Sequence, residues 1–397
     1  MCISLFTKEC LPGIIFYMEP NSINSQNPIQ QKPDFNPNTR VIKNRRGLIV
    51  GGTVFVLVFV AVLVTLAFRD SSSDSKYADK IEKWEAKQEQ KLSLGNIAGS
   101  GLSDEEDDDS SGNSSGDSSN GSVSGPISYD EDYTVTTKKD VVYGTVDGTS
   151  LKIDIYTPNG VSGATPAIMY IHGGGFRGGS KNGVADDSLM LAKHGIAVVA
   201  VDYRLSGVAE FPAQIHDVKG ATRFIKANAS TYNIDPNKIF SLGESAGGVL
   251  ASLLGVTKTG TTLEGTVGGN TSYNSGVIGV INISGSYVAS IVDTMSGGIK
   301  NAISAVVDCS PVPSSTCESE YEPLSPETYI DSTDAPFIIL HGDKDGSVPT
   351  IQAETLQDKL QTKGVSAELH VAPDLAHVGG LLSRYLDEVI SFINSNI

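Results

Sequence analysis

Residues 238–255 read KIFSLGESAGGVLASLLG, and this stretch decides the fold. The apolar run at 238–242 predicts a strand, and the small and apolar residues from Ser245 onward predict a helix that packs closely against a sheet. Between the two, residues 243–247 (GESAG) fit the pattern G-x-S-x-G, a sharp strand-to-helix turn that projects a serine above the sheet. Ser245 is therefore the candidate nucleophile.

The same pentapeptide pattern occurs a second time, at residues 112–116 (GNSSG). That copy lies in a polar stretch with no strand before it and no apolar helix after it, so its context excludes Ser114. An ordinary N-cap serine would also explain a turn at Ser245, but it would not explain the other motifs described below.

From Tyr129 onward, short apolar runs alternate with helical stretches, which is typical of a parallel sheet covered by helices on both faces. The expected strands cover 151–156, 167–172, 196–202, 238–242, 277–283, 336–341 and 365–371. The expected helices include 211–229, one that opens at Ser245, 351–362, and one from about 377 to 394. The fold class is therefore α/β, with a mostly parallel sheet in a catalytic domain at 129–397.

A serine hydroxyl needs a histidine to accept its proton and an acid to orient that histidine, in the chain order Ser, acid, His. FIILHGDKDGSVP (337–349) offers Asp343 and Asp345 where a strand enters a loop, and spacing does not separate the two. His370 lies inside the strand-like run AELHV and is interpreted as structural. His377 lies in a loop before the last helix and is the candidate base.

Residues 172–175 (HGGG) follow directly after the apolar run AIMYI. Glycines there let backbone N–H groups point at an anionic tetrahedral intermediate, and the N–H of Ala246 is expected to complete this oxyanion hole. A phosphate-binding loop is the alternative, but neither of the glycine-rich phosphate-binding patterns is present. The expected chemistry is ester hydrolysis that needs no metal and no cofactor.

Several of these motifs occur in a shared order: YIHGGGFRGGS, VDYRLS, FPAQIHDVKGATRFIKAN, NIDPNKIFSLGESAGGVLASLLG and HGDKDGSVP, followed by His377. Over about residues 141–394 the chain resembles the hormone-sensitive-lipase-like serine esterases of the α/β-hydrolase fold. Within these it is most similar to the acetyl and feruloyl esterase (BD-FAE-like) branch. The resemblance implies that Ser245 is the nucleophile, His377 the base and Asp345 the acid, with oxyanion donors at Gly174, Gly175 and Ala246.

The resemblance also implies a structural role for His172, and it implies that residues 202–204 (DYR) shape the sheet edge near the site. Two stretches depart from the family pattern, at 257–276 and from 284 to about 335. Both are expected to overhang the site and to set the acyl and alcohol pockets. The natural ester therefore stays open among a cell-surface polymer, a polysaccharide decoration, a lipid and a small xenobiotic.

Two other functions are compatible with parts of the pattern. A serine exopeptidase of the prolyl-oligopeptidase type shares the Ser-Asp-His order and an acid loop like HGDKDGSVP, but residues 69–128 leave no room for the propeller that such enzymes usually carry. A catalytically inactive hydrolase acting as a binding module predicts a broken triad, whereas all the positions are filled here.

Residues 48–68 (LIVGGTVFVLVFVAVLVTLAF) contain no charge, and at 1.5 Å per residue they extend about 30 Å, the thickness of a bilayer core. Lys43, Arg45 and Arg46 precede this segment and an acidic stretch follows it, so residues 1–47 are predicted to form a cytoplasmic tail. The segment is too long for a cleaved signal peptide. An uncleaved anchor is expected whether translation starts at Met1 or Met18.

Residues 69–128 are expected to form a short charged helical segment followed by a flexible acidic, Ser- and Gly-rich linker. The formal net charge of the chain, −17, argues against a nucleic-acid partner, because binding phosphates requires a basic surface. The expected partners are the membrane and a small-molecule or polysaccharide ester.

The four cysteines divide at the predicted anchor. Cys2 and Cys10 lie on its cytoplasmic side, whereas Cys309 and Cys317 lie outside, where disulfides persist. The turn-rich spacer SPVPSST lets Cys309 and Cys317 approach each other, so they are candidates for a disulfide. Two unpaired surface thiols are the alternative.

Overall fold

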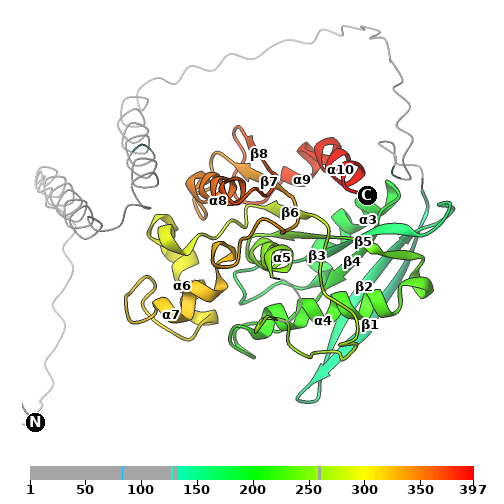
Figure 1. Cartoon of the computed structure of the whole chain (residues 1–397), viewed down its shortest axis with the longest axis horizontal. Helices are drawn as coiled ribbons and strands as arrows, with labels where there is room; N and C mark the ends of the chain where they lie inside the picture. The colour runs from blue at the N-terminus through cyan, green and yellow to red at the C-terminus, as the bar shows by residue number, and fades with distance from the viewer. Residues whose placement is uncertain (1–82, 84–126, 128–132, 258–260) are drawn as a thin grey trace, which may run out of the picture. The chain divides into compact units, whose positions relative to one another are not determined.

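An eight-stranded sheet forms the centre of the computed structural model, which describes residues 83, 127, 133–257 and 261–397 (Figure 1). The strand order is β1-β2-β4-β3-β5-β6-β7-β8. Strand β2 is antiparallel to β1 and β4, and the other neighbouring strands are parallel to each other. The strands are β1 (Val135–Val146), β2 (Thr149–Pro158), β3 (Thr165–Ile171), β4 (Ala197–Val201), β5 (Ile234–Glu244), β6 (Val280–Ile283), β7 (Phe337–Gly342) and β8 (Ala367–Ala372).

The central strands are buried on both faces, which explains their continuous apolar sequences. In β7, Phe337 and Ile339 belong to one hydrophobic cluster, and Ile338 and Leu340 belong to the cluster on the opposite face. All four side chains are inaccessible to solvent. The predicted mostly parallel sheet with two covered faces is therefore confirmed.

Helices α4, α5 and α8 pack on one face of the sheet, and α3 and α10 pack on the other (Figure 1). The helices of eight or more residues are α3 (Ala185–Lys193), α4 (Ala213–Ala227), α5 (Ala246–Val256), α6 (Gly297–Val306), α8 (Thr350–Thr362) and α10 (Leu386–Ser395). Shorter ones are η1 (Lys181–Val184), η2 (Ala229–Tyr232), η3 (Ala289–Thr294), α7 (Glu318–Tyr321), η4 (Glu322–Leu324), η5 (Pro326–Thr328) and α9 (Leu381–Arg384). None of the helices in the described residues is long and apolar enough to cross a bilayer.

Two features differ from the sequence-based expectation. Strand β1 was not predicted, because its sequence VTTKKDVVYGTV is largely exposed and lacks a continuous apolar run, as suits a strand at the edge of a sheet. The helix expected at 377–394 is wrong at its start: α9 begins at Leu381, and α10 follows after Tyr385. Gly380 has a φ of +77°, a left-handed conformation that delays the helix and leaves His377 in a loop.

The N-terminal predictions lie outside the described residues. These are the cytoplasmic tail at 1–47, the membrane span at 48–68, the segment at 69–128 except for Lys83 and Ile127, and the excluded Ser114. They stay predictions.

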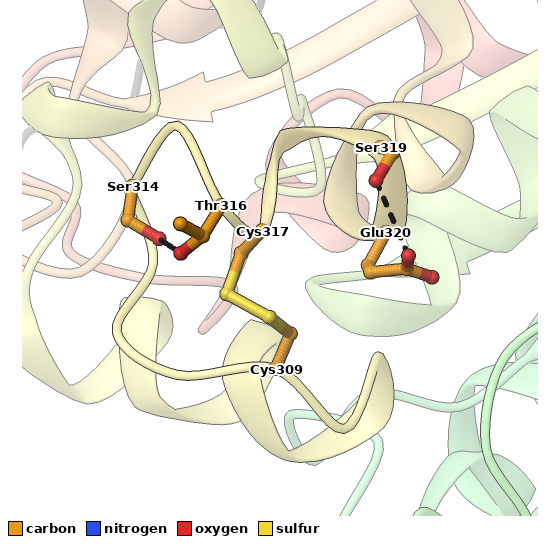
Figure 2. The surroundings of a disulfide bond; sticks show 6 residues. All are labelled: Cys309, Ser314, Thr316, Cys317, Ser319 and Glu320. Atoms are coloured by element: carbon orange, nitrogen blue, oxygen red, sulfur yellow. Dashed lines mark hydrogen bonds between the residues drawn. A yellow bond between two sulfur atoms is a disulfide. The ribbon is translucent and has the colours of Figure 1, made fainter.

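The insertion at 284–335 folds into short helices from η3 to η5 beyond the ends of β6 and β7. Within it, a disulfide joins Cys309 and Cys317, whose Cα atoms are 5.6 Å apart (Figure 2). The bond closes the loop between α6 and α7, and Cys317 is completely buried. Of the two alternatives left open by the sequence, the structure has the disulfide.

We expect the double variant Cys309→Ser/Cys317→Ser to lose about 2 kcal/mol of unfolding free energy, because the bond restricts a short loop in the unfolded chain. Urea unfolding of the purified protein measures this loss. Cys2→Ser/Cys10→Ser is the matched control and should leave the urea midpoint unchanged. Equal midpoints for the two double variants would contradict the prediction.

Candidate active site

Ser245 occupies the turn between β5 and α5. Its φ and ψ are 51° and −119°, a strained backbone conformation for a residue with a side chain. A Cβ atom on Gly243 would collide with the carbonyl of Gly247, and one on Gly247 would collide with the carbonyl of Ile171. The turn therefore requires glycine on both sides of Ser245, as the pentapeptide predicted.

Three side chains from separate loops meet at this turn. The Ser245 Oγ is 2.8 Å from Nε2 of His377, and Nδ1 of His377 is 2.7 Å from Oδ2 of Asp345. His377 lies between β8 and α9, and Asp345 follows β7. With the Nδ1 proton bonded to the carboxylate, Nε2 is left as an acceptor for the serine hydroxyl. The three predicted residues thus form one continuous hydrogen-bonded chain.

The Asp345 carboxylate is held by more than the histidine. Its Oδ1 accepts hydrogen bonds from the backbone N–H groups of Ser347 and Val348, both 2.9 Å long. Burial by itself raises the pKa of this carboxyl, but the His377 and backbone hydrogen bonds outweigh burial and lower the pKa below its usual value. Asp345 therefore stays ionised beside the imidazole.

His341 supports the same loop and was missed by the sequence reasoning. It is fully buried, its Nε2 donates to the Val348 carbonyl at 2.7 Å, and the same nitrogen is 3.5 Å from Asp345. Burial lowers the pKa of His341, which favours a neutral ring. The only feature of the sequence that could have indicated this role is the position of His341 at the end of a buried strand, four residues before Asp345.

The HGGG loop lies directly against the serine turn. A Cβ atom on Gly173 would be 2.9 Å from the Glu244 carbonyl and 3.3 Å from the Ser245 Cβ. Gly174 and Gly175 have φ values of +110° and +60°, which other residues rarely adopt. Gly174 and Gly175 line one cavity together with Ser245, and Ala246 lines a second cavity with Ser245 and Gly175, so their role as oxyanion donors stays a prediction.

His172 has the surroundings of a structural residue. Its ring is buried and stacks on Tyr203 with centroids 4.3 Å apart, and the Tyr203 hydroxyl donates to the His172 carbonyl at 3.0 Å. Asp202 accepts a hydrogen bond from the Lys181 backbone N–H, and Arg204 pairs with Asp217. Residues 202–204 thus brace the edge that carries the glycine loop.

Two alternative residues lie outside the hydrogen-bonded chain. The Asp343 carboxylate accepts from the backbone N–H of Asp374, and the His370 ring lies on β8 near Tyr385, with centroids 5.3 Å apart. The described residues of the departure at 257–276 do not line the cavities beside Ser245, so for these residues the expected overhang was wrong. Its described residues lie along α4, where Lys219 and Arg223 bind the Glu264 carboxylate.

Glu244, next to the nucleophile, is half-buried in a cluster of two carboxyls and one phenol. The Tyr170 hydroxyl is 2.8 Å from Glu244 Oε1 and 3.1 Å from Asp187 Oδ2. One hydroxyl proton serves only one acceptor at a time. Burial, with the neighbouring Asp187 charge, raises the pKa of Glu244 above its ordinary value.

This raised pKa predicts a pH-dependent effect of Glu244→Gln. The native state binds the Glu244 proton more tightly than the unfolded state, so its stability falls as pH rises from the unfolded pKa through the raised native one. The Glu244→Gln variant has no carboxyl at this position, so it lacks this pH-dependent loss of stability. We therefore expect its Tm relative to the parent protein to be higher at pH 7 than at pH 4.

Thermal unfolding at the two pH values measures this difference. The exposed Glu210→Gln is the matched control, because it removes a carboxylate at the surface. The same Tm difference at pH 4 and pH 7 for Glu244→Gln would contradict the assignment.

Comparison with known proteins gives a family and several relatives. The BD-FAE family model matches residues 153–360, more than half of the chain, and this range contains Ser245 and Asp345. The isoprenylcysteine alpha-carbonyl methylesterase ICME of Arabidopsis thaliana is 25% identical over 68% of this chain and 65% of its own length. The probable carboxylic ester hydrolase LipM of Mycobacterium tuberculosis is 32% identical over 51% of this chain and 46% of its own length.

The chain thus spans less than two thirds of the length of these curated relatives. Among solved structures, a truncated form of a carbohydrate esterase from gut microbiota is similar, with a TM-score of 0.59 and 28% identity. That similarity covers 68% of this chain and 99% of the other.

Proposed function

This chain belongs to the BD-FAE family, and from that premise we propose that it is a membrane-anchored, extracytoplasmic carboxylic ester hydrolase with a Ser245-His377-Asp345 triad. The proposed substrates are esters of short acyl, acetyl or feruloyl type. The observation that carries the proposal is the pair of hydrogen bonds, 2.8 and 2.7 Å long, that joins the three side chains. The names of its relatives, among them a methylesterase and a carbohydrate esterase, support an ester substrate.

In the proposed acylation step, His377 Nε2 takes the proton of Ser245 as Oγ bonds to the ester carbonyl carbon. The carbonyl oxygen becomes an anion, and the backbone N–H groups of Gly174, Gly175 and Ala246 stabilise it. The ionised Asp345 stabilises the imidazolium that forms. When the intermediate collapses, His377 gives the proton to the departing alkoxide, so an alcohol leaves and Ser245 remains acylated.

Deacylation repeats these roles with water. His377 takes a proton from water as its oxygen attacks the acyl carbon, and the collapse returns that proton to the Ser245 Oγ and releases the acid. Every proton that moves is held by His377, and the Asp345 carboxylate keeps its charge throughout. The chain's own residues are sufficient for both steps.

The proposed location rests on the sequence at 48–68 and its basic flank, which keep residues 1–47 in the cytoplasm. The disulfide between Cys309 and Cys317 supports the extracytoplasmic side for the hydrolase, because such bonds persist in oxidising surroundings. Protease added to intact cells should remove a hydrolase fragment and leave the cytoplasmic tail protected. If the protease instead digests residues 1–47 and leaves the hydrolase domain protected, the proposed orientation is overturned.

The activity is tested with the full-length protein, p-nitrophenyl acetate and a fluorophosphonate probe. We expect ester hydrolysis and a covalent adduct on Ser245. A folded protein that neither hydrolyses esters nor accepts the probe would instead act as a binding module. Faster turnover of proline-containing aminoacyl amides than of short esters would identify an exopeptidase.

A further inference from the structure

Two cavities of very different size adjoin Ser245. One is small, apolar and partly open, with a volume of about 30 Å³, and its lining includes Ala246, Met295, Ile299, Ile303 and Leu324. The other is open, with a volume of about 440 Å³, and its lining includes His172, Glu244, Ser347, His377 and Val378. Ser245, Gly175 and Ile299 line both cavities, so an ester bound at the serine has one group on each side.

His377 identifies the side that takes the alcohol. In an acyl transfer at Ser245 the departing alkoxide receives its proton from His377, so it must lie next to that imidazole. His377 lines the open cavity and does not line the small one. The alcohol therefore belongs in the open cavity, and the acyl chain belongs in the small one.

Much of the small cavity is lined by the insertion that departs from the family pattern. Met295 follows η3, Ile299 and Ile303 lie on α6, and Leu324 ends η4. Helix α6 rests on the glycine loop, since a Cβ atom on Gly175 would be 3.3 Å from the Ala302 Cβ. The disulfide ties the chain after Ile303 to the chain before Leu324, and Ile303 and Leu324 are at most 3% exposed. The wall is packed and cross-linked.

The volume of the small cavity limits the length of the acyl chain. A water-sized group needs about 10–15 Å³ of such volume, so the cavity holds a methyl group and about one carbon more. A butyryl chain or an aromatic feruloyl group exceeds this space, and the side chains around it are already in a buried core. The open cavity imposes no comparable limit on the alcohol.

We propose that the insertion makes this enzyme selective for acetyl esters over esters of longer acyl chains, with no comparable limit on the alcohol, and that Ile303 and Met295 set the acyl length. The inference rests on the proposed ester hydrolysis and selects one acyl class within it. Of the acyl groups named in the proposed function, the inference retains acetyl and excludes feruloyl. Ile303 and Met295 act by occupying space beside the acyl carbon, and neither takes part in proton transfer.

The test compares kcat/KM of the full-length protein on the p-nitrophenyl esters of acetate, propionate and butyrate, with methyl ferulate as the aromatic acyl probe. One methylene in an apolar pocket changes kcat/KM by about 10-fold or more, so we expect acetate to exceed butyrate by at least about 10-fold. Methyl ferulate should not be turned over. Butyrate or ferulate turnover as fast as that of acetate would overturn the inference while leaving the esterase activity intact.

The variants Ile303→Ala and Met295→Ala enlarge the cavity at two separate points. Each should raise the butyrate-to-acetate ratio of kcat/KM by about 10-fold. Val306→Ala is the matched control, because Val306 is buried on the same helix but does not line the cavity. It should leave the ratio unchanged even if it lowers Tm.

The outcomes separate the two proposals. Unchanged ratios in both enlarging variants, each folded by circular dichroism, would overturn the acetyl-selection inference alone. An absence of hydrolysis of every ester by the parent protein, together with no fluorophosphonate adduct, would overturn the proposed function itself.

Discussion

Replacing Ser245 with alanine is expected to lower kcat for p-nitrophenyl acetate by a factor on the order of 10⁶, because the nucleophile that forms the acyl-enzyme is lost. The remaining residues still bind the ester and present the oxyanion donors, so a small residual rate above that of water is expected. Initial rates at saturating ester, measured together with Tm, separate loss of chemistry from loss of folding.

The chain supplies its own control for this experiment. Ser114 is the central residue of the second G-x-S-x-G pentapeptide, at 112–116. Ser114→Ala should retain full activity and full labelling by the fluorophosphonate probe. If the probe still labels the Ser245→Ala variant but no longer labels the Ser114→Ala variant, the nucleophile is Ser114 and the proposed triad is overturned.

The second large effect is expected for Asp345→Asn. An asparagine cannot supply the negative charge that stabilises the imidazolium, and its amide favours the tautomer of His377 that points a proton at Ser245. We expect kcat to fall about 10⁴-fold, with KM nearly unchanged because Asp345 does not reach the substrate cavities. The steady-state parameters for p-nitrophenyl acetate measure both quantities.

Asp343→Asn is the matched control, two residues earlier in the same loop. The Asp343 side chain is 35% exposed, lies 3.5 Å from Lys344 and accepts from the Asp374 backbone, without contacting His377. Its variant should retain activity within about a few-fold, as for an ordinary surface position. A large loss of kcat in Asp343→Asn with little loss in Asp345→Asn would identify Asp343 as the acid in place of Asp345.

Local sequence patterns were sufficient for the elements that lie near the serine. Residues 238–255 predicted a strand, a tight turn and a helix, and these are β5, the turn at Ser245 and α5. The apolar run at 336–341 likewise became β7, because a strand buried on both faces needs apolar side chains at nearly every position. Edge strand β1 is solvated instead, so its polar sequence gave no comparable signal.

The sequence by itself determined the α/β fold class, the serine turn and the glycine loop, because each depends on residues that are adjacent in the chain. Spacing alone did not separate Asp345 from Asp343, and only the family resemblance pointed to Asp345. The tertiary structure supplies the physical reason, because the Asp345 carboxylate is the one that reaches His377, 32 residues later. Only the tertiary structure likewise revealed the support from His341, the position of 261–276 along α4, and the small cavity lined by α6. These features arise from contacts between distant segments, and no local pattern encodes the geometry of such contacts.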